Sequence, residues 1–273
     1  MSDDRALGVF DSGVGGLTVV RAIADLLPDE AVRYVGDTAR SPYGPRPVAE
    51  IRRFALEIAD HLARSDVKML VVACNSIEVS AIEDVAAAHG LPVVGVIAPG
   101  VRAAARATRS GRVGLIGTEA TVASGAYGRA VEAEGIGVEL IAAACPSFVG
   151  HVEAGDTSSP ALRVAAEGYL APLLAAGIDT LILGCTHYPM LAELLASVVG
   201  PDVVLVSSAE ETARDVAGAL AATGAARAQG ASAPAHDIGC TGEPAAFREV
   251  AARVLGDGLG EVRRIELGVA SWR

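Results

Sequence analysis

Short runs of branched aliphatic residues alternate with longer segments of helical period along the first hundred positions. The runs predict strands over 7–10, 32–35, 69–73 and 92–97, and the segments between them predict helices over about 16–27, about 47–63 and up to about 89. This alternation indicates right-handed βαβ units and a parallel sheet.

The same alternation restarts after Ala98-Pro99-Gly100, which we expect to interrupt it. Strands are predicted over 112–116, 138–142, 180–183 and 203–206, and helices over about 101–108, 122–134 and about 161–176. Ser207-Ser208, followed by two glutamates, predicts a further helix that returns to the first unit. We therefore expect two doubly wound α/β lobes, formed by residues 1–97 with 207–273 and by residues 98–206. The stretch 222–235, rich in Ala, Gly and Ser, predicts a surface connection.

A faint internal repeat supports two related lobes. Val9-Phe10-Asp11-Ser12-Gly13 and Leu115-Ile116-Gly117-Thr118-Glu119 are both apolar runs that end in small or polar residues, and each precedes a cysteine by a similar interval. Parallel α/β sheets bind ligands at the carboxyl ends of their strands. We expect the lobes to be related by a pseudo-twofold axis, with the active site in the cleft between them.

Composition narrows the class of protein. Of the 273 residues, 51% are apolar and 20% are charged, which is typical of a globular protein. The net charge of −11 argues against direct binding of nucleic acid and against a polybasic membrane contact. The start of the chain has no basic region followed by a long apolar stretch, and no later run is long enough to span a membrane, so we expect a cytoplasmic protein.

The chain has four cysteines, and two of them stand at the ends of predicted strands. No two form a C-x-x-C pair, which disfavours a disulfide framework and a local zinc site, so we expect no bound metal. For Cys145 and Cys240 we expect inert burial. Cys74 and Cys185 differ, because each lies where a strand passes into a helix, whose free N–H groups stabilise a thiolate.

Two such thiols suit an inversion at carbon. One thiolate removes a proton from one face of the carbon, and the other thiol delivers a proton to the opposite face. His187 adds a titratable partner beside Cys185. A single Cys–His pair would also serve acyl transfer, which needs only one thiol and an oxyanion hole. A thiol-ligated metal or redox protein is a third hypothesis.

The glycine-rich segment Gly13-Val14-Gly15-Gly16 does not fit a nucleotide-binding motif. Thr18 stands where the dinucleotide fingerprint needs a third glycine, and no P-loop lysine follows. The segment either holds a small anion such as a carboxylate at a helix N-terminus or serves tight packing. Asp11, at the end of a strand, is either a ligand-binding side chain or a helix cap.

Other polar residues have equally open roles. Tyr43 lies in a loop rich in proline and glycine, where it either reaches a ligand or covers the core. Asn75, Ser76 and Thr186 follow the two thiols and suit an amino-acid head group, although capping is their alternative role. Glu153, taken alone, is expected at the surface.

Five motifs together resemble a known family. These are Phe10-Asp11-Ser12-Gly13-Val14-Gly15-Gly16, Pro42-Tyr43-Gly44, Ala73-Cys74-Asn75-Ser76, Val152-Glu153-Ala154-Gly155 and Gly184-Cys185-Thr186-His187-Tyr188-Pro189. They resemble the glutamate racemases of the cofactor-independent aspartate/glutamate racemase superfamily, in particular actinobacterial members. The resemblance runs from about residue 8 to 213 and is weak over the last sixty or so residues.

The resemblance implies a cofactor-independent isomerase that interconverts L- and D-glutamate and supplies D-glutamate for peptidoglycan. Cys74 and Cys185 are then the acid/base thiols, of which the first acts on D-glutamate and the second on L-glutamate. Asp11 assists Cys74, His187 assists Cys185, and Glu153 is a further acidic site residue. The implied substrate contacts come from Asp11, Ser12, Tyr43, Gly44, Asn75, Ser76, Thr118, Thr186 and His187.

Two residues depart from the family pattern, and the resemblance leaves some properties of the protein open. The family commonly has Thr at the position of Ser76, and Glu78 stands where small residues are expected. Glu78 either changes the charge near Cys74 or faces solvent. The resemblance also implies a homodimer and, for some actinobacterial members, inhibition of DNA gyrase. An aspartate racemase, or another amino-acid racemase with the same pair of thiols, is the alternative activity.

Overall fold

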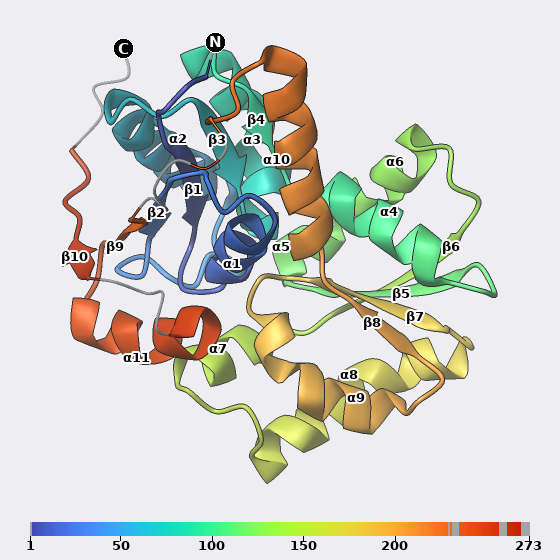
Figure 1. The fold of residues 1–273 in the computed structure, drawn as a ribbon. Helices are drawn as coiled ribbons and strands as arrows, with labels where there is room; N and C mark the ends of the chain where they lie inside the picture. Colours follow the sequence, from blue (N-terminus) through green and yellow to red (C-terminus); the bar gives the residue numbers. More distant parts are fainter. Residues whose placement is uncertain (1, 229, 231–234, 257–260, 269–273) are drawn as a thin grey trace.

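Two parallel β-sheets form the framework of the protein, and helices pack against both of them (Figure 1). The structure, a computed structural model, describes residues 2–228, 230, 235–256 and 261–268. The sheet of the first lobe has six strands, in the order β10-β9-β2-β1-β3-β4, and that of the second lobe has four, in the order β6-β5-β7-β8. Every strand pair in both sheets is parallel.

The strands of the first lobe are β1 (Leu7–Asp11), β2 (Val32–Gly36), β3 (Met69–Val72), β4 (Val93–Val94), β9 (Asp237–Cys240) and β10 (Val262–Arg264). Those of the second are β5 (Arg112–Gly117), β6 (Glu139–Ala144), β7 (Thr180–Gly184) and β8 (Val204–Val206). The order β2-β1-β3-β4 thus recurs as β6-β5-β7-β8, which confirms the repeated α/β lobes expected from the sequence.

The helices that flank the first sheet are α1 (Leu17–Leu26), α2 (Val48–Arg64), α3 (Asn75–His89), α10 (Ala209–Thr223) and α11 (Pro244–Leu255). The second lobe contains α4 (Ile97–Ala107), α5 (Glu119–Ala123), α6 (Ala126–Ala133), α7 (Phe148–Glu153), α8 (Pro160–Ala175) and α9 (Ala192–Val199), with a 3-10 turn at Tyr188–Leu191. In Figure 1, α10 crosses back from the second lobe to pack beside α1.

The strands are buried on both faces, as their continuous apolar sequences predict. Val9 and Val71 pack in one apolar cluster with α1 and α10, whereas their neighbours Phe10 and Val72 pack in another with α2 and α3. Alternate side chains of one strand point to opposite faces. The sheet is therefore fixed from both sides, and the strand ends that carry polar residues hold a defined position.

The crossover between the lobes differs from the sequence-based expectation. The expected strand 92–97 is only Val93–Val94, and α4 already begins at Ile97. The predicted interruption at residues 98–100 is therefore wrong. Pro99 lies in the first turn of α4, where a missing N–H costs no intrahelical bond, and the Gly100 N–H donates to the Val96 carbonyl at 3.1 Å.

The expected helix 122–134 is divided as well. Its two parts, α5 and α6, meet at Gly125, whose φ of 66° lies in the left-handed region. Glycine adopts this conformation without a steric penalty, so the chain turns there. No helix among residues 2–228, 230, 235–256 and 261–268 is long and apolar enough to cross a membrane.

The C-terminal part contains elements that the sequence pattern did not reveal. Strands β9 and β10 extend the first sheet beyond β2, and α11 packs against α1. Residues 207–223 and these later elements accompany the first sheet, as the expected division at 97/98 and 206/207 requires, although the boundaries themselves stay a prediction. Of the expected connection 222–235, residues 229 and 231–234 lie outside the described part of the chain.

Candidate functional site

The carboxyl ends of the two sheets meet at one small cavity. Both thiols, Cys74 after β3 and Cys185 after β7, line it. Its lining residues are Ser12, Tyr43, Gly44, Cys74, Asn75, Ser76, Thr118, Val149, Cys185, Thr186 and His187. The cavity offers about 10 Å³ to the centre of a water molecule, roughly enough room for one water. The lobes are therefore closed on each other, and an amino-acid substrate enters only when they separate.

On the first-lobe side, Cys74 is linked to a carboxylate through a serine. The Cys74 thiol donates to Ser12 Oγ at 3.5 Å, and the Ser12 hydroxyl donates to Asp11 Oδ1 at 3.2 Å. Burial raises the pKa of the Cys74 thiol well above its usual value, and the nearby Asp11 charge raises it further, while Ser12 and the Ile77 N–H oppose the shift. Instead of the thiolate that its place at the start of α3 suggested, Cys74 is a thiol here, ready to donate a proton.

On the second-lobe side, Cys185 has a histidine partner. Its sulfur lies 3.7 Å from His187 Nδ1, and His187 Nε2 lies 3.4 Å from Glu153 Oε1. Burial by itself would lower the pKa of His187, but the contacts with Cys185 and Glu153 outweigh it and raise the pKa well above its usual value. The second thiol therefore has a proton-bearing imidazole beside it, which the first thiol lacks.

Glu153 stands at the edge of the site on α7. Its side chain is 29% exposed, against 2% for His187, and it also accepts a hydrogen bond from the Ser41 hydroxyl. Burial would raise the pKa of Glu153, but the contact with His187 and the hydrogen bond from Ser41 lower it. The ionised carboxylate thus faces the imidazole from outside the cavity, which the surface expectation for a lone glutamate did not foresee.

Asp11 joins the two lobes. It is fully buried, and its Oδ2 accepts a hydrogen bond from the Thr186 hydroxyl at 2.8 Å. Its other oxygen accepts the Ser12 N–H at 2.6 Å. Asp11 does not line the cavity itself, so it acts on the thiols through Ser12 and Thr186.

Two glycines of the segment 13–16, Gly13 and Gly15, lie at the inter-lobe contact, whereas Gly16 faces Asp11 and Tyr34 of its own lobe. A Cβ at Gly15 would fall 2.4 Å from Thr186 Oγ1, and one at Gly13 would fall 2.9 Å from Glu153 Oε1. Gly44 faces Thr118 in the same way, at 2.9 Å from its Cβ. Real Cβ contacts are not this short, so these glycines permit the close approach of the lobes. Of the two roles expected for the segment, the structure supports packing, and anion binding stays a prediction.

Two polar side chains at the cavity are held by partners outside it. The Tyr43 hydroxyl donates to the buried Asp37, so its ring lines the cavity while its hydroxyl points away. The Asn75 amide donates to the Tyr127 hydroxyl at 2.8 Å. Asp37 and Tyr127 carried no sequence signal for this role, because they lie outside the five motifs.

A further inter-lobe bond connects Ser76 and Thr118, whose hydroxyls lie 3.0 Å apart. Thr118 also caps α5, since its Oγ1 accepts the Thr121 N–H at 3.2 Å. The sequence reasoning missed Ser41 and Val149 as well, although Ser41 directly precedes the Pro42-Tyr43-Gly44 motif.

The remaining cysteines stand apart from the cavity lining. Cys145 and Cys240 are both fully buried, and burial raises the pKa of Cys145 to about 12, so both remain thiols at neutral pH. No group of three or more His, Cys, Asp or Glu side chains suited to a metal ion occurs in the described part of the chain. Neither Lys nor Arg is among the described residues that line the cavity.

Comparisons with known proteins show the family to which the chain belongs. Residues 15–216 match the model of the Asp/Glu/Hydantoin racemase family. The chain is 53% identical to the glutamate racemase of Beutenbergia cavernae over 270 residues, which cover 95% of this chain and 92% of the relative. It is also similar to the solved structure of a Bacillus anthracis glutamate racemase, with 39% identity, a TM-score of 0.90 and coverage of 97% and 99% of the two chains. A Francisella tularensis glutamate racemase solved in complex with D-glutamate has 33% identity, a TM-score of 0.89 and coverage of 98% and 100%.

Proposed function

The chain belongs to the glutamate racemase family, and we propose that Cys74 and Cys185 interconvert L- and D-glutamate by a two-base transfer of the Cα proton. The observation that carries this mechanism is the placement of the two thiols, one from each lobe, on the same closed cavity. The chemistry is that of an isomerase: one C–H bond breaks, another forms on the opposite face of Cα, and no electrons leave the substrate. The activity supplies D-glutamate for the cell wall.

Each direction uses the thiols in opposite roles. With L-glutamate, the Cys185 thiolate takes the Cα proton, and the Cys74 thiol donates its proton to the other face. With D-glutamate, Cys74 is the base and Cys185 the acid. After one turnover the two sulfurs have exchanged their protonation states. The starting states must be restored before another molecule of the same enantiomer reacts. Proton transfer by positioned groups of this kind contributes roughly 10²–10⁴-fold to a rate.

The surroundings of the two thiols suit Cys74 as the acid and Cys185 as the base in the reaction of L-glutamate. The raised pKa of Cys74 keeps it protonated, as an acid for L-glutamate requires. The protonated His187 places a positive charge 3.7 Å from the Cys185 sulfur, where a thiolate base would stand. Ser12 and Asp11 offer Cys74 a route for proton exchange, and Glu153 holds His187 in its charged form.

Glutamate recognition is proposed to rest on neutral groups. The polar residues of the cavity lining that carry the substrate are Ser12, Tyr43, Gly44, Asn75, Ser76, Thr118, Thr186 and His187, with Asp11 behind them. Hydroxyls, amides and backbone N–H groups then bind the carboxylates. Separation of the lobes admits glutamate, and closure places it in an enclosed polar site that stabilises the carbanionic transition state.

The decisive experiment substitutes each thiol in turn. Cys74→Ser and Cys185→Ser are expected to lose racemisation almost entirely, measured by the circular dichroism of L- and D-glutamate without added cofactor. The matched control is Cys240→Ser, because Cys240 is buried yet does not line the cavity. Near-normal turnover by the Cys74→Ser/Cys185→Ser double variant would exclude the two-thiol mechanism.

Solvent exchange and a substrate panel complete the test. In D₂O the product is expected to carry deuterium at Cα from the first turnovers, since the donated proton comes from an exchangeable thiol. Aspartate tested beside glutamate separates the proposed activity from that of an aspartate racemase. Preferential turnover of aspartate would reassign the substrate while leaving the two-base chemistry in place.

Three further expectations stay predictions: the homodimer, the cytoplasmic location and the absence of cofactors. Light scattering of the purified protein tests whether it is a homodimer.

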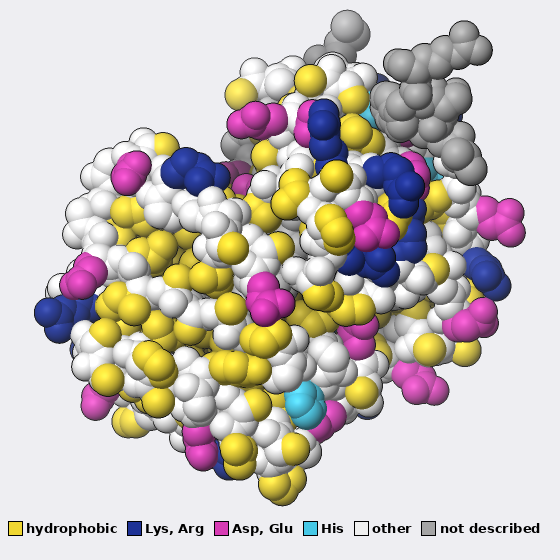
Figure 2. All heavy atoms as spheres, turned by 180° about the vertical axis from the view of Figure 1, so that it is seen from behind, with side chains coloured by type: hydrophobic (Ala, Val, Ile, Leu, Met, Phe, Trp, Pro, Cys, Tyr) yellow, Lys and Arg dark blue, Asp and Glu magenta, His cyan; other side chains and the backbone are white. Residues whose placement is uncertain are grey.

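Inhibition of DNA gyrase also stays a prediction. On the face seen in Figure 2, acidic and basic side chains are interspersed, and hydrophobic atoms separate them, so this face does not imitate the uniform charge of DNA. A supercoiling assay with Cys74→Ser separates any inhibition from catalysis.

A further inference from the structure

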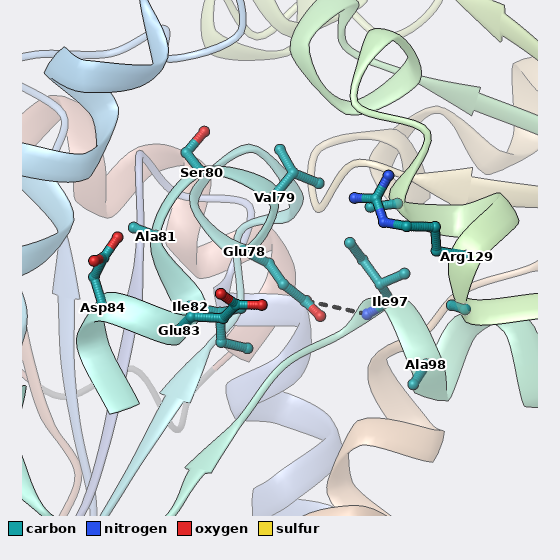
Figure 3. Close-up of a pocket in the computed structure, with 12 residues that line it drawn as sticks. Glu78, Val79, Ser80, Ala81, Ile82, Glu83, Asp84, Ile97, Ala98 and Arg129 are labelled. Carbon is teal, nitrogen blue, oxygen red and sulfur yellow. Dashed lines mark hydrogen bonds between the residues drawn. The ribbon is translucent and has the colours of Figure 1, made fainter. Parts of the chain in front are cut away.

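Glu78, one of the residues that depart from the family pattern, is half-buried and does not line the cavity of the thiols. It lies one helical turn after Cys74 on α3, and its N–H donates to the Cys74 carbonyl at 2.9 Å. Its carboxylate extends to the crossover between the lobes, where Oε2 accepts the Val96 N–H at 2.5 Å and the Ile97 N–H at 3.1 Å. These are the first N–H groups of α4. Figure 3 shows the bond to Ile97.

The backbone at the crossover is shaped to receive this carboxylate. A Cβ at Gly95 would fall 2.4 Å from both Cδ and Oε1 of Glu78. Any other residue at position 95 would displace the carboxylate from the start of α4. Glu78 and Gly95 therefore act as a pair: the missing side chain of one provides the space that the other fills.

The Glu78 carboxylate provides an N-terminal hydrogen-bond acceptor that the sequence of α4 itself lacks. Its N-cap residue, Val96, has no side chain that accepts a hydrogen bond, and its first turn contains no acidic residue. Helix N-termini carry unpaired N–H groups and a partial positive charge, which a carboxylate satisfies. Here the acceptor comes from a helix of the other lobe, so the cap is at the same time an inter-lobe connection.

Helix α4 packs against the strand that leads to the second thiol. Ile97 and Val101 of α4 pack in the same apolar cluster as Leu115 of β5 and Ile182 of β7, and β7 leads directly into Cys185. At the other end, the first turn of α3 begins at Cys74. A short rigid path thus runs from one thiol through Glu78 and α4 to the other.

Apolar packing accompanies the two hydrogen bonds only in part, since Val79 of α3 packs against the cluster that contains Ile97 and Val101. Surface pockets lie on both sides of the carboxylate, and Glu78 and Ala98 line both of them. Figure 3 shows the Glu78 side chain reaching across to Ile97 while its neighbours on α3 point elsewhere. Because the pockets leave gaps in the apolar packing, the two hydrogen bonds add a directional connection that Val79 alone does not provide.

From these contacts we propose that Glu78 is a positioning residue, which aligns Cys74 with Cys185 by fixing α3 to the start of α4 at the crossover between the lobes. The inference rests on the proposed function. The contact lies beside the covalent crossover between the lobes, so in this proposal it serves as the pivot on which the cleft opens. Loss of this contact misaligns the thiols while their own chemistry is unchanged, and a displacement of about 1 Å reduces a rate by about 10²-fold.

Two substitutions of Glu78 test the proposal. Glu78→Ala removes both hydrogen bonds, and kcat is expected to fall roughly 10- to 100-fold with little change of KM, because alignment matters most in the transition state. Glu78→Gln keeps an oxygen that accepts from the two N–H groups, so kcat is expected to remain within about threefold of the parent. Glu83→Ala is the matched control, since Glu83 is exposed on the same helix and lines the same pocket.

Thiol labelling gives a readout that does not depend on catalysis. The rates at which iodoacetamide modifies Cys74 and Cys185, followed by peptide mass spectrometry, are expected to rise severalfold in Glu78→Ala as the lobes separate more often. Glu78→Gln and Glu83→Ala are expected to match the parent protein. Should Glu78→Ala fail to fold, Glu78→Asp replaces it, because its shorter side chain does not reach α4.

The outcomes separate this proposal from the proposed function. A folded Glu78→Ala protein with parental kcat and labelling rates would overturn the positioning role. So would a loss of kcat with unchanged labelling, because Glu78 would then act on the chemistry or only on local stability. If the parent protein does not racemise glutamate, the proposed function fails, while the labelling rates still test the connection between the lobes.

Discussion

The carboxylate of Asp11 and the hydroxyl of Thr186 form a 2.8 Å hydrogen bond between the two lobes, across 175 positions of sequence. Asp11 ends the central strand of the first sheet, and Thr186 follows the second thiol. The bond exists only when the lobes are closed, because the two residues belong to different sheets. It therefore couples closure to the position of Asp11 beside Ser12 and Cys74.

Replacement of Thr186 by valine keeps the shape of the side chain and removes the donor. Thr186→Val leaves Asp11 Oδ2 buried without this hydrogen bond, which is expected to cost about 1–3 kcal/mol in the free energy of unfolding. We expect kcat/KM to fall at least roughly tenfold, since about 1.4 kcal/mol of lost stabilisation in the closed state has that effect. Urea denaturation and steady-state kinetics measure the two effects. Thr186→Ser, which keeps the hydroxyl, is expected to behave as the parent, and equal losses in both variants would contradict the role of the bond.

A methyl group at Gly15 prevents full closure. Its Cβ would lie 2.4 Å from Thr186 Oγ1 and 2.7 Å from the Thr186 carbonyl carbon, so the lobes must move apart. For Gly15→Ala we expect kcat to fall by about 10²-fold or more, with a smaller change in the thermal midpoint, because each lobe still folds around its own core. Gly218→Ala is the control, since no atom lies within 4 Å of its added Cβ. Parental kcat in Gly15→Ala would show that catalysis does not need this closed arrangement.

The carboxylate of Glu153 sets the charge of His187. In Glu153→Gln the negative partner 3.4 Å from Nε2 is lost, so the raised pKa of His187 is expected to move down toward its ordinary value. If the cationic form of His187 supports catalysis, activity is lost as the pH rises through this pKa, and the loss begins at lower pH in the variant. The pH profile of kcat/KM and the NMR titration of the imidazole report the shift.

Asp156→Asn is the matched control for this substitution. Asp156 forms a 2.8 Å pair with His151 but does not line the cavity, so its loss is expected to leave the pH profile unchanged. A Glu153→Gln enzyme with the parental profile would mean that Glu153 does not govern the proton on His187.

Glu78 makes the stability of the fold depend on pH. Burial raises its pKa from 4.5 to about 7, and the Val96 and Ile97 N–H groups only partly oppose this shift. Between these values the folded state holds a proton that the unfolded chain releases. The contribution to stability is therefore complete below the unfolded pKa of 4.5 and is lost as the pH rises through about 7.

Glu78→Gln removes this titration. We expect the thermal midpoint of the parent, relative to that of Glu78→Gln, to fall as the pH increases across this window. Other ionisable groups near the carboxylate line the two pockets beside it, and Tyr127 is a further one, whose pKa the Glu78 charge helps to raise. The groups in the pockets are Glu83, Asp84 and Arg129 in one, and Arg214 and Asp215 in the other. Glu83→Gln is expected to keep the parental pH dependence. A constant difference between Glu78→Gln and the parent at every pH would contradict the raised pKa.

The local pattern of the chain was sufficient to predict much of the framework. Strands β1, β2, β3 and β5 begin where the apolar runs begin, because a strand buried on both faces needs a continuous apolar sequence. The start of α4 was misplaced, because its N-cap acceptor, Glu78, comes from another helix. Strands β9 and β10 were missed, since both are short: β9 joins the sheet through β2, about two hundred positions away, and β10 pairs with β9.

The sequence alone placed Cys74 and Cys185 at the ends of two strands and so predicted that both thiols serve one site, because parallel strands of related lobes present their carboxyl ends alike. Only the tertiary structure shows that Asp11 bonds Thr186, that Gly15 touches the opposite lobe and that Glu78 caps α4. Hydrophobic periodicity is local: it specifies which face of a strand or helix is buried. Which side chains meet across the cleft depends on how two separately packed lobes close, and no short stretch of sequence encodes that geometry.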